Sequence, residues 1–323
     1  MLTVSHVYYL AALLLAAAAW LNLRERHYGN ALFWGILAAV FAGGDAVLSA
    51  HQAGNRWPAQ CVGVGMLVLA LLAGTGRLRR VEAATGELAE RRASANRLGH
   101  RLFGPALLIA VITGALALGG KWLKIGDIAL LSAQNSTLVA LAIACSIALI
   151  AALRVTRAPV SRALSEHRRL LDTMGWAAVL PMLLAALGAV FLSTGVGDAI
   201  AAVTTAVIPV DSRVACVLAY AVGMLVFTMI MGNAFAAFPV MTGGIALPLL
   251  IGSHGADAAA LGALGMLSGY CGTLLTPMAA NFNMVPSALL ELKNPYGVIL
   301  AQWPTALALF AANIAFMLLF AFR

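Results

Sequence analysis

The sequence reads Met231-Gly232-Asn233-Ala234-Phe235-Ala236-Ala237-Phe238-Pro239 and later Ser268-Gly269-Tyr270-Cys271-Gly272-Thr273-Leu274-Leu275-Thr276-Pro277-Met278-Ala279-Ala280-Asn281-Phe282-Asn283, two polar segments in a strongly apolar chain. In a bilayer, a backbone that leaves the helix must find hydrogen-bond partners in protein, bound ions or trapped water. Two such breaks are typical of the discontinuous helices that form substrate and ion sites in secondary transporters. The two segments therefore predict a transporter.

The composition identifies the class of protein. The chain has 323 residues, of which 62% are hydrophobic and 10% are charged, whereas soluble domains average about 25% charged residues. Apolar runs of spanning length lie at residues 6–23, 31–50, 59–76, 102–119, 136–153, 176–194, 214–230 and 298–320. We therefore predict an all-α, polytopic integral membrane protein with about eight spanning helices, plus a helical hairpin and a broken helix in the C-terminal half.

The basic residues indicate an orientation in the membrane. Fourteen of the twenty lysines and arginines lie in the loops 24–29, 77–101 and 154–172, whereas Arg56, Lys121, Lys124 and Arg213 lie on the opposite side. The positive-inside rule then predicts cytoplasmic loops at those three places and an N-terminus outside. Most of the basic residues behind the net charge of +8 thus cluster in these loops, so we expect no nucleic-acid partner.

The chain divides after Asp172. Residues 1–172 contain five plain apolar runs and are expected to form a scaffold-like part. Residues 173–323 are expected to form a transport-like part, with a hairpin at 214–251 whose tip is Gly232-Asn233, and a broken helix at 258–292. Gly262, Gly265 and Gly269 form a small-residue stripe that predicts close approach of a neighbouring helix.

Uncharged hydrogen-bonding groups gather at the two breaks. We predict that substrate and ion are bound by Gly232, Asn233, Ser268, Thr273, Thr276, Pro277, Asn281 and Asn283. Hydroxyl and carbonyl oxygens suit Na⁺, while the positive ends of resumed half-helices suit a carboxylate. Two alternatives stay open: Asn233 could cap the following helix, and the Ser268 and Thr273 hydroxyls could bond to carbonyls of their own helix.

Asp45 is a candidate of another kind, because it is an acid inside an early apolar run. Coupling to a proton and bridging to a partner are both open for it. The breaks hold no central acid, which favours Na⁺ over H⁺ as the coupling ion; we expect no other cofactor. No nucleophile motif, metal-binding spacing or C-x-x-C pair occurs, so we expect neither an enzyme nor a metalloprotein.

The two segments quoted above, with Glu291-Leu292-Lys293-Asn294-Pro295-Tyr296-Gly297-Val298-Ile299, resemble the bacterial membrane family known as "domain of unknown function 979" over the whole chain. The resemblance implies one subunit of a two-subunit 5-oxoproline (pyroglutamate) transporter in the bacterial inner membrane. The other subunit would be a smaller membrane protein of a sister family.

The hairpin and the Thr-Pro break are also distantly similar to the ion transporter superfamily, which includes divalent-anion/sodium symporters and the large membrane subunit of TRAP transporters. In that superfamily, two inverted halves each supply a hairpin tip and a broken helix that hold the substrate carboxylate and Na⁺. This chain has one such pair, so we expect a second polypeptide to supply the rest; a homo-oligomer stays open.

The sequence thus favours a membrane subunit of a cation-coupled carrier for a small organic anion, with 5-oxoproline as the candidate. The alternative from another class is a non-transporting membrane assembly or regulatory subunit. The carrier hypothesis requires Asn233 and the segment 273–283 to reach one polar cavity.

Overall fold

The structure, a computed structural model, describes residues 2–78, 85–119, 124–125, 128–129 and 135–322. The chain forms two compact units, Met1–Thr173 and Met174–Arg323. The boundary between them falls one residue after the division at Asp172.

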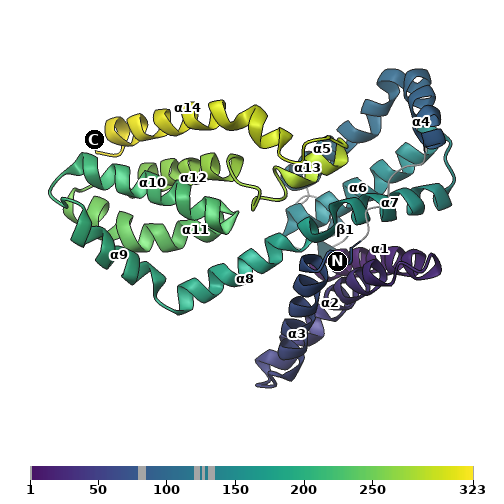
Figure 1. Cartoon of the computed structure of the whole chain (residues 1–323), viewed down its shortest axis with the longest axis horizontal. Coiled ribbons are helices and arrows are strands. Elements are labelled where there is room, and N and C mark those ends of the chain that lie inside the picture. Colours follow the sequence, from purple (N-terminus) through teal and green to yellow (C-terminus); the bar gives the residue numbers. More distant parts are fainter. Residues whose placement is uncertain (1, 79–84, 120–123, 126–127, 130–134, 323) are drawn as a thin grey trace. The chain divides into compact units, whose positions relative to one another are not determined.

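The first unit is built from pairs of neighbouring helices. Helix α1 packs along α2, and α5 packs along α6, while α1 also touches α6. Figure 1 shows these helices in purple to teal. The elements of this unit are α1 (Val4–Arg24), α2 (Tyr28–Gln52), α3 (Trp57–Gly74), α4 (Thr85–Leu98), the 3₁₀ turn η1 (Gly99–Leu102), α5 (Phe103–Gly119), the two-residue strands β1 (Lys124–Ile125) and β2 (Ile128–Ala129), α6 (Ser136–Thr156) and α7 (Val160–Met174).

The second unit centres on α10, α12 and α14, which pack against one another. Helix α9 lies against the π-helix η4, and α10 and α11 form the two arms of a hairpin. The elements of this unit are η3 (Gly175–Ala178), α8 (Leu180–Ser193), α9 (Val196–Val207), α10 (Arg213–Met231), α11 (Ala234–Met241), η4 (Thr242–Ser253), α12 (Ala258–Leu274), α13 (Met284–Leu289) and α14 (Gly297–Phe320).

Within the described part of the chain, nine helices are long and apolar enough to cross a membrane: Val4–Arg24, Tyr28–Gln52, Trp57–Gly74, Arg92–Gly119, Ser136–Thr156, Val160–Phe191, Arg213–Met231, Ala234–Ser253 and Gly297–Phe320. The prediction of an all-α, polytopic membrane protein is confirmed. Of the basic loop 77–101, residues 79–84 lie outside the described residues, and much of the remainder forms α4 and η1.

The two breaks differ in length from the sequence prediction. The first interruption is confined to Gly232 and Asn233, because α11 begins at Ala234 and runs through Pro239 into η4. The second arm of the hairpin, Ala234–Ser253, is itself long enough to span. Within the broken helix 258–292, α12 continues to Leu274. The helix stops close to Pro277, which disfavours helical geometry at the residue before it.

Candidate functional site

The hairpin tip is a sharp reversal that only a glycine fits easily. Gly232 ends α10 with φ +66°, and its N–H donates to the Thr228 carbonyl at 2.7 Å. A side chain at this position would collide with the Met278 carbonyl and with Leu184 Cδ1. The tip of the hairpin thus lies directly against the second break.

Asn233 begins the next helix. Its backbone is extended (φ −151°, ψ 120°), and its Oδ1 accepts from the Phe235 N–H at 2.8 Å. The capping role that the sequence left open is therefore present in the structure. The Asn233 amide nitrogen stays available at the tip, since the cap uses only the oxygen.

The second break, Leu275–Asn283, is held by side-chain amides. Asn283 Nδ2 donates to the carbonyls of Thr273 at 2.8 Å and Thr276 at 2.6 Å. Gln302, on α14, donates from Nε2 to the Leu274 carbonyl at 3.1 Å and to Asn283 Oδ1 at 2.5 Å. Carbonyls freed at the end of α12 thus find partners inside the protein, as a helix broken at membrane depth requires.

Thr276 ties the break to the hairpin. Its hydroxyl donates to the Met229 carbonyl on α10 at 2.8 Å and accepts from the Met278 N–H at 3.2 Å. The tip and the break therefore contact each other at two places, because Gly232 also lies against Met278. The two polar segments form one structure.

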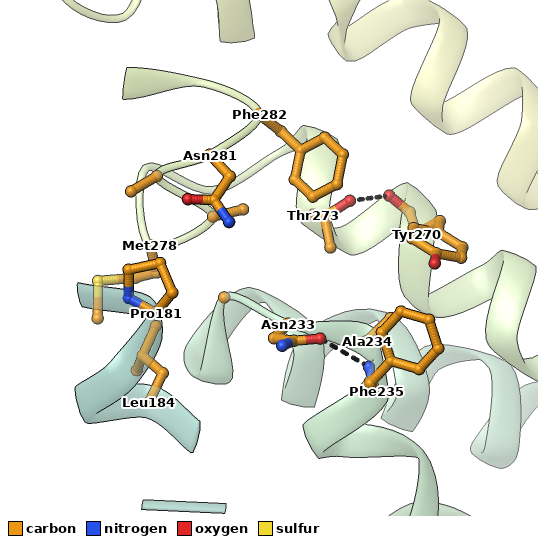
Figure 2. A pocket seen from close by; sticks show the side chains of 13 residues that line it. Pro181, Leu184, Asn233, Ala234, Phe235, Tyr270, Thr273, Met278, Asn281 and Phe282 are labelled. Carbon is orange, nitrogen blue, oxygen red and sulfur yellow. Dashed lines mark hydrogen bonds between the residues drawn. The ribbon is translucent and has the colours of Figure 1, made fainter. Parts of the chain in front are cut away.

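Both segments line the same pocket, with a cavity volume of about 220 Å³ (Figure 2). Four of the predicted site residues line it: Gly232, Asn233, Thr273 and Asn281. The remaining walls are Pro181, Leu184, Ala234, Phe235, Tyr270, Met278, Ala279, Ala280 and Phe282. None of these lining residues carries a carboxyl or basic group, so polarity at this site comes from amides, the hydroxyls of Tyr270 and Thr273, and backbone groups.

The other four predicted residues lie outside the pocket lining. Ser268 is fully buried and donates to the Leu264 carbonyl four residues earlier, at 2.9 Å. Thr276 and Asn283 are also buried and serve the bonds described above, while Pro277 lies next to Thr276. Thr273 lines the pocket, but its hydroxyl donates to the Tyr270 carbonyl at 2.6 Å. Ser268, Thr276, Pro277 and Asn283 therefore support the site rather than line its cavity.

Aromatic side chains and one amide were missed as site residues. Phe235 and Tyr270 line the pocket with their rings edge to face, 6.0 Å between centroids, and Figure 2 shows Phe282 above them. All three stand in the quoted segments. Gln302 lies outside both segments, although an amide in the apolar run 298–320, which Gln302 shares with Thr305 and Asn313, was a signal that could have identified it.

A helix N-terminus lies at the pocket and supplies partial positive charge there. Helix α11 begins at Ala234, which lines the pocket, and continues into η4. The first-turn N–H groups carry the partial positive charge of a helix N-terminus. Beside them stands the amide of Asn233, and Asn281 lies across the cavity (Figure 2).

The remaining candidates lie elsewhere. Asp45 is exposed on α2, in the first unit. In the described part of the chain, no group of three or more His, Cys, Asp or Glu residues could hold a metal ion. The four cysteines are free, with Cys61 and Cys145 exposed and Cys216 and Cys271 buried.

Comparison with known proteins gives one match. A family model described as "Protein of unknown function (DUF979)" matches residues 5–322. No curated protein matches the chain, and no solved structure matches it.

Proposed function

Because the chain belongs to the DUF979 family, whose model covers residues 5–322, we propose the function that the resemblance of its polar segments implies. The protein is one membrane subunit of a secondary transporter for a small organic anion, with 5-oxoproline as the candidate substrate. A coupling cation drives uptake, and a second, smaller membrane subunit completes the transporter. The observation that carries this proposal is the convergence of hairpin tip and helix break on one pocket.

The pocket suits a small, partly apolar carboxylate. Its volume of about 220 Å³ lies below the range of about 300–1,000 Å³ typical of ligand pockets, which favours a compact molecule. The α11 N-terminus and the Asn233 amide would receive the carboxylate. The rings of Phe235, Tyr270 and Phe282 offer apolar surface to a five-membered ring, and Asn281 could bond to its lactam group.

Sodium is the favoured coupling ion. The lining residues include no carboxyl group that could carry a coupling proton, whereas carbonyl and hydroxyl oxygens are hard ligands suited to Na⁺. Asp45 stays a candidate for coupling by another route or for contact with the partner subunit. In the orientation that the positive-inside rule predicts, the protein lies in a bacterial inner membrane with its N-terminus outside. The loops 24–29, 77–101 and 154–172 then face the cytoplasm.

The test is uptake of labelled 5-oxoproline into proteoliposomes. Vesicles contain this chain alone or together with the sister-family subunit, with and without an inward Na⁺ gradient. We expect uptake only with both chains and only with the gradient. Uptake driven equally by a proton gradient would replace the coupling ion. Failure to transport any small carboxylate, with both chains correctly inserted, would favour the assembly or regulatory subunit instead.

A further inference from the structure

A second polar cluster lies in the first unit and shares no residue with the pocket. Asp172, in the last turn of α7, is 2% exposed. Its Oδ1 accepts from Trp34 Nε1 on α2 at 2.7 Å and from Asn22 Nδ2 on α1 at 3.1 Å. The same Asn22 nitrogen donates to the Ala18 carbonyl at 3.1 Å. Asp172 therefore joins α7 to both α1 and α2.

Two buried oxygens of this cluster have no hydrogen-bond partner in the part of the chain that the structure describes. They are Asp172 Oδ2 and Asn22 Oδ1, and Asn22 is fully buried. The amide oxygen of Asn22 is always an acceptor, and Asp172 Oδ2 is an acceptor as long as the carboxyl group is ionised. A buried acceptor without a donor destabilises the fold, so two of them on neighbouring side chains need an explanation.

One proton would satisfy both atoms. A carboxylic acid and an amide can pair through two parallel hydrogen bonds, one from the amide nitrogen to the carboxyl oxygen and one from the carboxyl O–H to the amide oxygen. The first of these bonds, from Asn22 Nδ2 to Asp172 Oδ1, is present. A proton on Oδ2 turns that orphan acceptor into a donor, and Oδ1 of Asn22, the residue already bonded to Asp172, is the acceptor it would complete.

The surrounding charges do not require an ionised Asp172. Helix α1 faces it with the neutral Asn22, and α2 faces it with the neutral Trp34 and Asn30; all three side chains hydrogen-bond to its carboxyl group. Arg168 acts on it electrostatically from α7, but Nη1 of that guanidinium already lies 2.5 Å from Glu25 Oε2.

The next basic residue of α7, Arg169, is also in an ion pair: its Nε lies 3.0 Å from Glu166 Oε2. Each of the two arginines thus has an acid other than Asp172 beside it, although among the described residues Arg168 Nε has no hydrogen-bond partner. An ionised Asp172 would be an additional buried charge, which is costly unless it is paired.

We propose that Asp172 is a proton-binding site, held as the neutral acid by Asn22, and that this proton fastens α7 to α1 and α2. Release of the proton leaves a buried carboxylate beside an unpaired amide oxygen and weakens the attachment of α7. Because the first unit ends at Thr173, the protonation state acts where the chain passes into the second unit. This proposal does not depend on transport or on the substrate.

The test is infrared spectroscopy of the purified full-length chain in lipid nanodiscs, titrated from acid to alkaline pH. A protonated carboxyl group has a C=O stretch separate from the carboxylate bands. We expect such a band at neutral pH, its loss in Asp172→Asn, and no change in Asp211→Asn, which alters an exposed loop acid. Trp34→Phe removes one donor to the carboxyl oxygen and should shift the band without removing it.

Thermal unfolding separates a proton site from a structural carboxylate. Asparagine places an N–H donor where the protonated Oδ2 would be, so Asp172→Asn should keep the wild-type Tm while Asp172→Ala lowers it. A Tm lowered equally by both variants would show that the charge itself is required and would overturn the proposal. Absence of the protonated-carboxyl band at neutral pH would also overturn the proposal. Loss of that band on addition of Na⁺ would do the same, because the site would then bind Na⁺ in place of the proton.

Discussion

Asn281 is a pocket residue whose side chain is not used to hold the fold together. It is exposed, and within the described part of the chain its amide takes part in no hydrogen bond that holds the break together. A hydrogen bond to a charged ligand contributes about 1.5–3 kcal/mol. We therefore expect Asn281→Ala to lower the uptake rate at low substrate about tenfold or more, with an unchanged Tm.

The control for this prediction is Asn96→Ala, which makes the same chemical change at an exposed position of α4 in the other unit. Uptake by this variant should equal that of the wild type. Equal uptake by Asn281→Ala and Asn96→Ala would remove Asn281 from the binding site.

Replacement of Gly232 by alanine should destabilise the protein for two separate reasons. Its positive φ costs an alanine about 1–3 kcal/mol, and the added Cβ would also collide with the Met278 carbonyl. Gly54 has a positive φ as well (+84°) but open space around it. We expect Gly232→Ala to lower Tm clearly more than Gly54→Ala and to abolish uptake. Matching Tm losses in a thermal-unfolding assay would show that the tip does not rest on the break.

At the scale of elements, the break after α12 depends on donors supplied by α14 and by the break itself. Asn283→Asp keeps the shape of the side chain but removes the N–H groups that reach Thr273 and Thr276. The freed carbonyls would then be unsatisfied beside a new charge. We expect loss of both thermal stability and uptake, measured on protein that still inserts into the membrane.

Asn294→Asp is the matched control, because Asn294 acts through Oδ1, which accepts from the Tyr296 N–H and is retained in aspartate. This variant should keep its Tm and its uptake. A wild-type Tm for Asn283→Asp would mean that water or another group can replace the hydrogen bonds from Asn283 to the Thr273 and Thr276 carbonyls.

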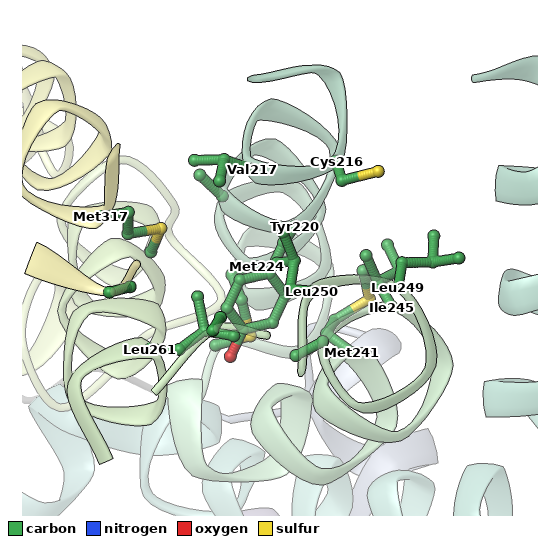
Figure 3. Close-up of a cluster of buried hydrophobic side chains, with 14 residues drawn as sticks. Cys216, Val217, Tyr220, Met224, Met241, Ile245, Leu249, Leu250, Leu261 and Met317 are labelled. Atoms are coloured by element: carbon green, nitrogen blue, oxygen red, sulfur yellow. The ribbon is translucent and has the colours of Figure 1, made fainter. Parts of the chain in front are cut away.

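The packing of α10 against α12 could be predicted in part from glycine spacing. A Cβ on Gly265 would collide with the Tyr220 ring, and one on Gly269 would meet Met224 and Ala234, so these two glycines allow close approach as expected. Gly262 does not, since its Cβ would make an ordinary 3.6 Å contact with Phe238. Figure 3 shows Tyr220 and Met224 of α10 inside the cluster that these contacts enclose.

The positions of the breaks were predictable, but the use of each polar residue was not. Gly232 and Asn233 stand out because they are adjacent and interrupt a long apolar run. The continuation of α11 through Pro239 was not predictable, since proline usually ends a helix and the packing that keeps this one intact comes from α8, α10 and α12. Asn283 and Thr276 look like ligands in sequence; only tertiary contacts show that their bonds go to carbonyls.

At the scale of the whole molecule, the apolar runs predicted the spanning helices because length and composition decide insertion before any packing is known. Six of the eight runs correspond closely to helices of spanning length. The runs 102–119 and 176–194 differ, because the helices that hold them extend back to Arg92 and Val160. The second of these helices shows the reason. Its amphipathic first half, α7, carries Asp172 and the arginines, so hydropathy alone places its start too late.

The orientation of the whole chain can be tested at two exposed positions that the positive-inside rule predicts to lie on opposite sides of the membrane. Asn55 lies between α2 and α3, on the side with few basic residues, and Ser161 lies in the basic region 154–172. If the positive-inside rule holds, a membrane-impermeant maleimide should label Asn55→Cys in intact cells. It should label Ser161→Cys only after permeabilisation. The background should lack the four native cysteines, since Cys61 and Cys145 are exposed. Labelling in the reverse pattern would invert the topology and place the 24–29, 77–101 and 154–172 loops outside.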